Sequence, residues 1–191
     1  MCGRFLLTAP VEALRRLFGV TELPNLGARF NIAPTQDVPV VRAKAESAGA
    51  ADRELVMLRW GLIPSWAKDA SIAASLINAR GESVAEKPAF RAAFLQRRCL
   101  VPADGFYEWK AAAHTGAKGK PPPKQPYLIR RRDQMTFAFA GLWEHWRGDG
   151  RTGPLETFTI VTTDANADIA RLEQQVDSLE ATLGRKRRDL S

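Results

Sequence analysis

The chain is made of short apolar runs separated by stretches rich in glycine, proline and charged residues. Runs of about four to eight residues, rich in valine, isoleucine, phenylalanine and threonine, are typical of β-strands. The strands expected from this pattern are Val38–Arg42, Glu54–Trp60, Arg98–Val101, Gly105–Trp109, Tyr127–Arg131, Thr136–Ala140 and Thr157–Thr163. The sequence therefore predicts a strand-rich α+β fold with mixed or antiparallel sheets and short flanking helices.

Short helices and loops are expected between these strands. Val11–Phe18 is predicted to be a helix because Thr8–Pro10 provides a start signal and Gly19 a stop. The spacing of apolar residues predicts a second helix within Ala85–Arg97. Irregular or loop structure is expected at Arg29–Thr35, Ala43–Asp52 and residues 110–126.

The end of the chain has a different pattern. Four apolar residues from Leu172 to Leu183 are spaced by four, three and four positions, which predicts an amphipathic helix. The stripe is shorter than the three or so heptads of a stable coiled coil, so we expect a monomer. The expected organisation is one domain over residues 1–172, followed by an atypical C-terminal helix and basic tail over residues 173–191.

Positive charge is concentrated in the first 172 residues. The whole chain has 28 Lys and Arg against 21 Asp and Glu, a net charge of +7. Residues 173–191 hold four bases and four acids, which leaves 24 bases (28 − 4) and 17 acids (21 − 4) before them. This excess favours a polyanionic partner, with nucleic acid as the first candidate. The alternative is a basic solvated surface without such a partner.

Signals for membranes, secretion and metals are missing from the sequence. No apolar stretch reaches the eighteen or so residues of a membrane-spanning helix, and residues 1–20 lack the features of a signal peptide. Cys2 and Cys99 are too few for a disulfide framework, and with only two histidines a zinc site is not expected. We therefore expect a cytoplasmic protein, nucleoid-associated if bacterial, that uses no metal and no cofactor.

Cys2 is the residue with the most informative chemistry. Removal of Met1 would leave its α-amine and thiol on adjacent carbon atoms. An α-amine has a pKa of about 7.7–8.0, so a fraction is neutral at pH 7 and can form an imine with an aldehyde. The thiol can then add to the imine carbon and close a five-membered thiazolidine, which a lysine could not do. The alternatives are thiol attack on a carbonyl, as in N-terminal nucleophile hydrolases, and a cysteine without a chemical role.

Five segments resemble one known family. They are Met1–Phe5, Asn31–Thr35, Trp60–Trp66, Ile77–Glu82 and Pro102–Trp109. In this order and spacing they resemble the SRAP family, the SOS response-associated peptidase proteins, over Met1 to about Leu172. The resemblance implies a strand-rich SRAP fold that binds single-stranded DNA and links covalently to abasic sites during the SOS response to DNA damage.

The resemblance also implies roles for three residues in the reaction. Cys2 corresponds to the residue that crosslinks to the abasic sugar after loss of Met1. Asn78 corresponds to the amide that orients the N-terminal residue and the sugar, although alone it would be interpreted as a turn residue. Glu108 corresponds to the carboxylate that moves protons as water leaves, whereas strand alternation by itself would simply aim it at solvent.

Four more residues are implied as DNA contacts. Arg4 and Arg80 resemble phosphate ligands on either side of the lesion, although arginines near strands are often surface ion pairs. Trp66 and Trp109 are candidates for stacking on bases, a contact worth roughly 1–3 kcal/mol per base. The other interpretation of Trp109 is a core residue.

Three other residues are expected in the core. Trp60 and Trp143 each end an apolar run, and Cys99 lies within the apolar segment Arg98–Val101. A free cysteine in such a position behaves as a small hydrophobic residue.

The sequence departs from the family's pattern after Leu172. Family members usually continue into a His-Asp-Arg-x-Pro segment whose histidine belongs to the active site, but Glu173 stands at that place here. His145 lies too early to replace it, and His114 lies in the predicted basic loop. Residues 173–191 are therefore interpreted as foreign to the family, and slower chemistry is expected.

Three functions follow from the sequence. The first is an abasic site processing protein that forms protein–DNA crosslinks, with a lyase-type or peptidase-type classification. The second is a cysteine-type peptidase limited to self-removal of Met1. The third is a single-stranded DNA-binding module that has lost its reactivity.

Overall fold

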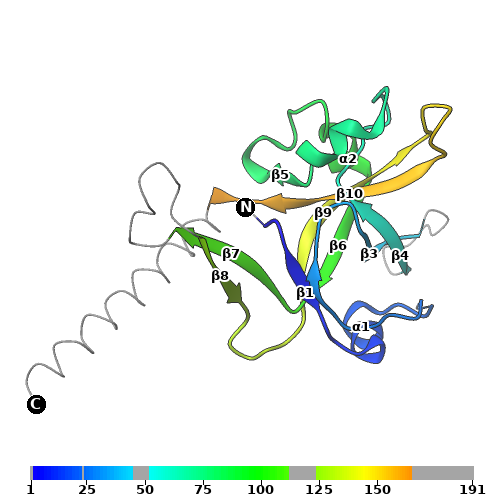
Figure 1. Ribbon diagram of the computed structural model, residues 1–191. Helices are drawn as coiled ribbons and strands as arrows, with labels where there is room; N and C mark the ends of the chain where they lie inside the picture. The colour runs from blue at the N-terminus through cyan, green and yellow to red at the C-terminus, as the bar shows by residue number, and fades with distance from the viewer. Residues whose placement is uncertain (1, 23, 45–51, 112–123, 165–191) are drawn as a thin grey trace, which may run out of the picture. The chain divides into compact units, whose positions relative to one another are not determined.

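The fold consists of two β-sheets with short helices around them, as seen in a computed structural model (Figure 1). The structure describes residues 2–22, 24–44, 52–111 and 124–164. This architecture confirms the predicted strand-rich α+β class. The predicted C-terminal helix, the boundary at residue 172 and Glu173 lie outside the described residues.

The larger sheet closes into a barrel. Its six strands follow the order β4-β3-β6-β9-β10-β5, and β10 also pairs in parallel with β4, where Phe158 lies opposite Trp60. The strands are β3 (Asp37–Ala43), β4 (Arg53–Trp60), β5 (Asn78–Arg80), β6 (Arg98–Ala103), β9 (Phe137–Trp146) and β10 (Leu155–Thr162). The β4–β10 pairing joins the end of β4 to β10, which brings the sheet around on itself and encloses the core.

The smaller sheet has four strands in the order β2-β1-β7-β8. They are β1 (Phe5–Leu7), β2 (Arg29–Ile32), β7 (Gly105–Ala111) and β8 (Lys124–Ile129). All its pairings are antiparallel, and β8 forms one edge. Because β6 and β7 are separated only by Asp104, this sheet is held directly against the barrel.

Helices are short. They are α1 (Val11–Phe18), α2 (Arg91–Gln96) and the 3₁₀ turns η1 (Ala70–Ser75) and η2 (Gly81–Ser83). The prediction for α1 is confirmed, and Gly19 ends it in the left-handed conformation that favours glycine (φ 67°). The predicted helix over Ala85–Arg97 was too long, because Pro88 cannot continue a helix from the preceding turn and only the last part is α-helical.

Several strand predictions need correction. Arg29–Ile32 forms β2 rather than irregular structure, since it pairs with β1. The strand predicted over Thr136–Ala140 is longer and runs from Phe137 to Trp146. It continues through Gly141, where β9 passes close to Cys99. A Cβ at Gly141 would lie 2.9 Å from the Cys99 sulfur, so glycine is needed there. The predicted loop over residues 110–126 is also shorter, since β7 and β8 extend into it.

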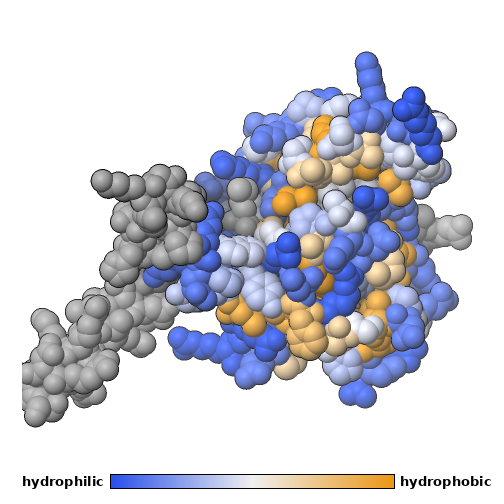
Figure 2. Space-filling model, in the orientation of Figure 1, coloured by the Kyte–Doolittle hydropathy of each residue, from blue (hydrophilic) through white to orange (hydrophobic). Residues whose placement is uncertain are grey.

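Trp60 is the centre of the core. It is fully buried, contacts Phe5 edge-to-face with ring centroids 5.2 Å apart, and stacks on Phe158 at 6.3 Å. The core prediction is confirmed for Trp60 and for the buried Cys99, whereas Trp143 is only half-buried at the edge of the core. Hydrophilic side chains cover much of the face seen in Figure 2, with smaller hydrophobic areas between them.

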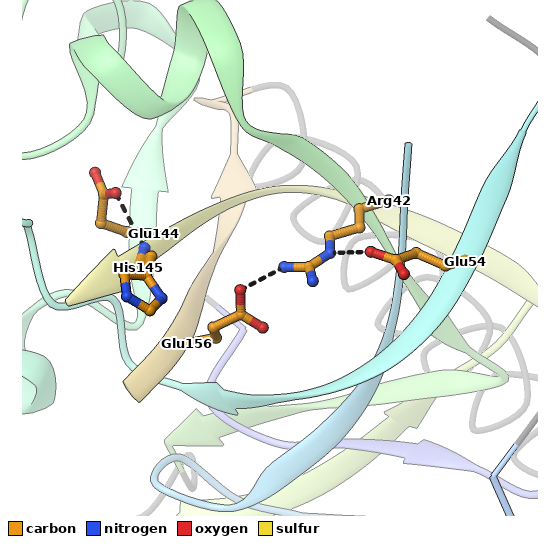
Figure 3. Close-up of polar contacts among 5 residues, drawn as sticks. All are labelled: Arg42, Glu54, Glu144, His145 and Glu156. Carbon is orange, nitrogen blue, oxygen red and sulfur yellow. Dashed lines mark hydrogen bonds and ion pairs between the residues drawn. The ribbon is translucent and has the colours of Figure 1, made fainter. Parts of the chain in front are cut away.

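A cluster of charges lies on β3, β4 and β10 (Figure 3). The Arg42 guanidinium donates to Glu54 at 2.6 Å and to Glu156 at 2.9 Å, and lies 4.2 Å from the centre of the Trp143 ring. Burial alone would lower the pKa of Arg42, but these two carboxylates raise it above its ordinary value. His145 of β9 lies directly opposite Glu156 in the β9–β10 ladder, and its main-chain amide donates to Glu144 at 3.0 Å.

Candidate site at the N-terminal cysteine

Cys2 lies at the edge of the core, just before β1. Its side chain is only 5% exposed and belongs to the same apolar cluster as Trp60. Burial is the main reason that the pKa of the Cys2 thiol is raised to about 12. At pH 7 the thiol is therefore protonated, unlike the activated thiolates of cysteine nucleophiles.

Asn78 holds the main chain of Cys2. Its side-chain Nδ2 donates to the Cys2 carbonyl oxygen at 2.8 Å. The preceding residue, Ile77, accepts hydrogen bonds at its carbonyl from the Trp60 indole (2.9 Å) and from the Ile160 amide (3.2 Å). The barrel therefore fixes Asn78 at the start of β5. Through its hydrogen bond to the Cys2 carbonyl, Asn78 in turn holds the N-terminal residue in place.

The other polar atom of the Asn78 amide has no hydrogen-bond partner among the described residues. The Oδ1 atom is buried and accepts no hydrogen bond from the described residues. A buried acceptor without a donor costs free energy, on the order of 1–3 kcal/mol. This atom is therefore ready to accept a hydrogen bond from a group that enters the site.

Glu108 lies close to Cys2. Antiparallel pairing places Phe106 of β7 opposite Phe5 of β1, and the Tyr107 amide donates to the Arg4 carbonyl at 2.9 Å. The next residue along β7, Glu108, is near enough for its negative charge to raise the pKa of the Cys2 thiol further. The structure thus brings together the three residues predicted to act in the reaction, from three separate segments of the chain.

Arg4 and Trp109 lie on the other face of the smaller sheet. Alternate residues of a strand point to opposite faces, so Trp109 shares a face with Tyr107, and Glu108 does not. Arg4 pairs with Tyr107 across the β1–β7 ladder and donates to Asn31 Oδ1 at 2.9 Å. Trp109 is 41% exposed, which excludes the alternative of a core residue.

Trp66 and Arg80 are both exposed. Trp66 lies in the segment that follows β4, and Arg80 is the last residue of β5. Trp66 is 61% exposed on the segment after β4, which the Trp146 indole anchors by donating to the Ala67 carbonyl at 2.8 Å. Arg80 follows Asn78 by two positions on β5 and therefore lies on the same side of that strand.

The sequence interpretation missed the role of Asp104. Its carboxylate accepts hydrogen bonds from the Thr8 amide (2.5 Å), the Thr8 hydroxyl (2.9 Å), the Ala9 amide (2.8 Å) and the Thr136 hydroxyl (2.6 Å). Burial would raise the pKa of Asp104, but these bonds lower it below its ordinary value. Asp104 thereby fixes the end of β1 to the start of β7. The sequence feature that could have indicated this role is the position of Asp104 inside the Pro102–Trp109 motif.

His145 does not reach this site. It lies opposite Glu156, whereas Ile160, which contacts Ile77, lies opposite Gly141. Four residues along a strand span about 13 Å. The prediction that His145 is not the family's active-site histidine therefore agrees with the geometry.

The described residues show neither a metal-binding cluster nor a membrane-spanning helix. They contain no group of three or more His, Cys, Asp or Glu that could hold a metal ion. No helix among the described residues is long and apolar enough to cross a membrane.

A closed barrel carrying a second small sheet, with a buried cysteine shortly before β1, defines this protein as a strand-rich α+β fold. The family model for SOS response associated peptidases (SRAP) matches residues 1–177, and the chain belongs to the SRAP family. It is 38% identical over 169 residues to abasic site processing protein YoqW of Bacillus subtilis, covering 87% of this chain and 70% of that relative.

More distant relatives and solved structures agree. Abasic site processing protein HMCES of Gallus gallus is 27% identical over 175 residues, covering 78% of this chain and 50% of the relative. A crystal structure of a Bacteroides thetaiotaomicron protein matches with a TM-score of 0.69 and 26% identity, covering 85% of this chain and 68% of that one. A phage-related protein of Bordetella bronchiseptica matches with a TM-score of 0.64 and 30% identity, covering 86% and 70%.

Proposed function

We propose that this protein binds single-stranded DNA and forms a covalent thiazolidine with abasic sites through Cys2. The observation that carries the proposal is the convergence of Cys2, Asn78 and Glu108 at one place. The relatives named abasic site processing proteins support an abasic site in DNA as the substrate, and the excess of basic residues supports a nucleic-acid partner.

The bonds would form in a definite order. The ring-opened abasic sugar carries an aldehyde, which the α-amine of Cys2 attacks after removal of Met1. Loss of water from the carbinolamine gives an imine. The Cys2 sulfur then bonds to the imine carbon, and the thiol proton passes to the nitrogen, which closes the ring.

Burial of the Cys2 thiol favours this order over initial attack by sulfur. With a pKa of about 12 the thiol contributes almost no thiolate at pH 7. The α-amine, with an ordinary pKa of about 7.7–8.0, supplies a larger neutral fraction. The amine is therefore the first nucleophile, and the thiol acts only when the imine carbon is already beside it.

Asn78 and Glu108 would supply orientation and proton transfer. The Asn78 amide already holds the Cys2 carbonyl, and its unpartnered Oδ1 can accept a hydrogen bond from the α-amine or from a sugar hydroxyl. Glu108, whose negative charge acts on the Cys2 thiol, would take a proton from the carbinolamine nitrogen and return one to the departing hydroxyl.

Exposed cations and aromatic rings would hold the DNA strand. Arg80 lies beside Asn78 and Arg4 beside Cys2, so each can contact a phosphate next to the lesion. Trp66 and Trp109 are exposed and can stack on unpaired bases, which favours single strands over duplex.

Glu173 would slow the reaction. An ordinary glutamate is ionised at pH 7 and is a poor acid, whereas a histidine titrates near 6.5.

The second candidate function is that of a peptidase that removes only its own Met1, using the same residues. The family's description as peptidases favours it.

The test compares two cysteine variants. Cys2→Ala is expected to abolish covalent linkage to single-stranded abasic DNA on a denaturing gel while reversible binding persists. Cys99→Ala is the matched control, because Cys99 is also buried but belongs to the barrel interior. Linkage that persists in Cys2→Ala, or that is lost in Cys99→Ala alone, would contradict the proposal.

A further inference from the structure

Tyr127 lies directly opposite Glu108 in the β7–β8 ladder. Directly opposed residues of an antiparallel pair point to the same face, with Cβ atoms about 4.5–5.5 Å apart. A tyrosine ring reaches well beyond the end of a glutamate side chain from such a position. The side chain of Tyr127 therefore leaves the sheet on the same face as that of Glu108, whose carboxylate the proposed reaction uses.

The surroundings of Tyr127 change along the strand. One step toward the core on the same face, Phe106 packs against the barrel and contacts Phe139 edge-to-face at 5.9 Å. At the next pair on this face, Tyr127 is already 47% exposed. The pair beyond it is Lys110 with Gln125, a cation and an amide. The face thus passes from apolar packing, through an exposed aromatic ring, to polar groups.

The order of apolar, aromatic and charged side chains along this face matches the base and phosphate of a nucleotide. Phe106 and the exposed Tyr127 ring offer an apolar, flat partner for a base. Lys110 belongs to the next residue pair outward on the same face, where a phosphate would follow. Among the described residues no hydrogen bond fixes the Tyr127 hydroxyl, so the ring is not committed to a partner within the fold.

We propose that the ring of Tyr127 stacks on the base of a nucleotide adjacent to the abasic sugar and thereby positions that sugar between Cys2 and Glu108. This inference rests on the proposed function and deepens it. It assigns a contact on the Glu108 face of the smaller sheet, whereas Trp109 serves the opposite face.

The chain offers a matched control in Leu128. It is the next residue on β8, it is similarly exposed (44%), and alternation places it on the other face, opposite Tyr107. Loss of either side chain perturbs the same edge strand, so only a contact specific to the Glu108 face separates the two variants.

The experiment measures reversible binding to a single strand that contains one tetrahydrofuran residue, an abasic analogue that cannot form an imine. Tyr127→Ala is expected to weaken binding by roughly 5- to 150-fold, the range that stacking on one base contributes. Tyr127→Phe keeps the ring and should bind like the unaltered protein, as should Leu128→Ala. Thermal unfolding of all three variants confirms that they are folded.

A second set of strands identifies the stacked base. The base on the 5′ or the 3′ side of the analogue is replaced by a second tetrahydrofuran. On one side the loss of the base should cost affinity in the unaltered protein but almost nothing more in Tyr127→Ala, because both changes remove the same contact. Equal and independent costs on both sides would overturn the inference.

Failure of the inference and failure of the function give different results. If the unaltered protein binds the strand and Tyr127→Ala binds as tightly, the stacking contact is wrong and the DNA-binding function stands. If the unaltered protein does not bind the strand, the proposed function fails and the inference fails with it.

Discussion

The side-chain amide of Asn78 donates a 2.8 Å hydrogen bond to the carbonyl oxygen of Cys2, across 76 positions of sequence. This bond joins the start of β5 to Cys2, which lies a short way before β1. It fixes the N-terminus against the barrel, and it leaves Asn78 Oδ1 buried with no donor from the described residues. The N-terminal region is thus held in place before any substrate arrives.

Asn78→Asp tests this orientation. A carboxylate cannot donate to the Cys2 carbonyl, and it adds a negative charge near the phosphates, so crosslinking should slow by about 10- to 1,000-fold. Removal of one positioned polar group at a reacting centre has effects of this order. Single-turnover crosslinking gives the rate, and Ser75→Ala, at an exposed position just before β5, serves as the control. An unchanged rate in Asn78→Asp would show that this hydrogen bond has no part in the reaction.

Salt dependence tests the two arginines. Each phosphate contact releases condensed counterions, and for a single strand it contributes about 0.7 to the slope of log affinity against log salt. Arg4→Gln and Arg80→Gln should each reduce that slope by about this amount. Arg132→Gln, an exposed arginine of the β8–β9 connection, should leave it unchanged. If the three variants give the same slope as the unaltered protein, neither arginine contacts a phosphate.

Glu173→His tests the departure from the family pattern. General acid–base assistance is worth about 10²- to 10⁴-fold, so the variant should crosslink faster than the unaltered chain if residue 173 reaches the site. A chain given a family-type C-terminal segment is the comparison. A faster rate with the full segment but not with Glu173→His would mean that residue 173 is wrongly placed. Equal rates in all three proteins would show that the histidine is dispensable here.

Alkaline pH tests the buried thiols. Burial raises the pKa of Cys99 from 9.0 to about 12, so the folded protein keeps this proton between pH 9 and 12 while the unfolded chain loses it. The unfolded state then binds fewer protons, and the free energy of unfolding falls as pH rises through this window. Cys99→Ala, which has no thiol to ionise there, should show a smaller decline in urea unfolding at pH 9 to 11. A decline as steep as in the unaltered protein would contradict the burial of this thiol.

The longer strands were predictable, including β7 with Glu108, whereas the short strands β1 and β5 beside the site were not. Val38–Arg42 and Glu54–Trp60 carry strong local patterns and form β3 and β4 nearly as expected. β1 and β5 have only three residues each, too few for any local pattern. They are strands because β7 and β10 pair with them, and such long-range pairing is invisible in a local window.

The same limit applies to the site. Cys2, Asn78 and Glu108 were recognised through the family resemblance, but their proximity follows from the β1–β7 register and from the anchoring of Ile77 by the barrel. Tyr127 was seen only as the start of a strand. Its relationship to Glu108 requires the register of β8, which begins inside the segment expected to be a loop.

The intact mass of the purified protein, before and after incubation with single-stranded abasic DNA, tests the central claim most directly. We expect the purified protein to lack Met1. After incubation, the unaltered chain and Cys99→Ala should gain the mass of the DNA strand minus one water, whereas Cys2→Ala should gain no DNA mass. Treatment with borohydride should add no hydrogen to the product, because a closed thiazolidine has no imine to reduce. A protein that retains Met1, or one that gains no DNA mass under denaturing conditions, would contradict the account.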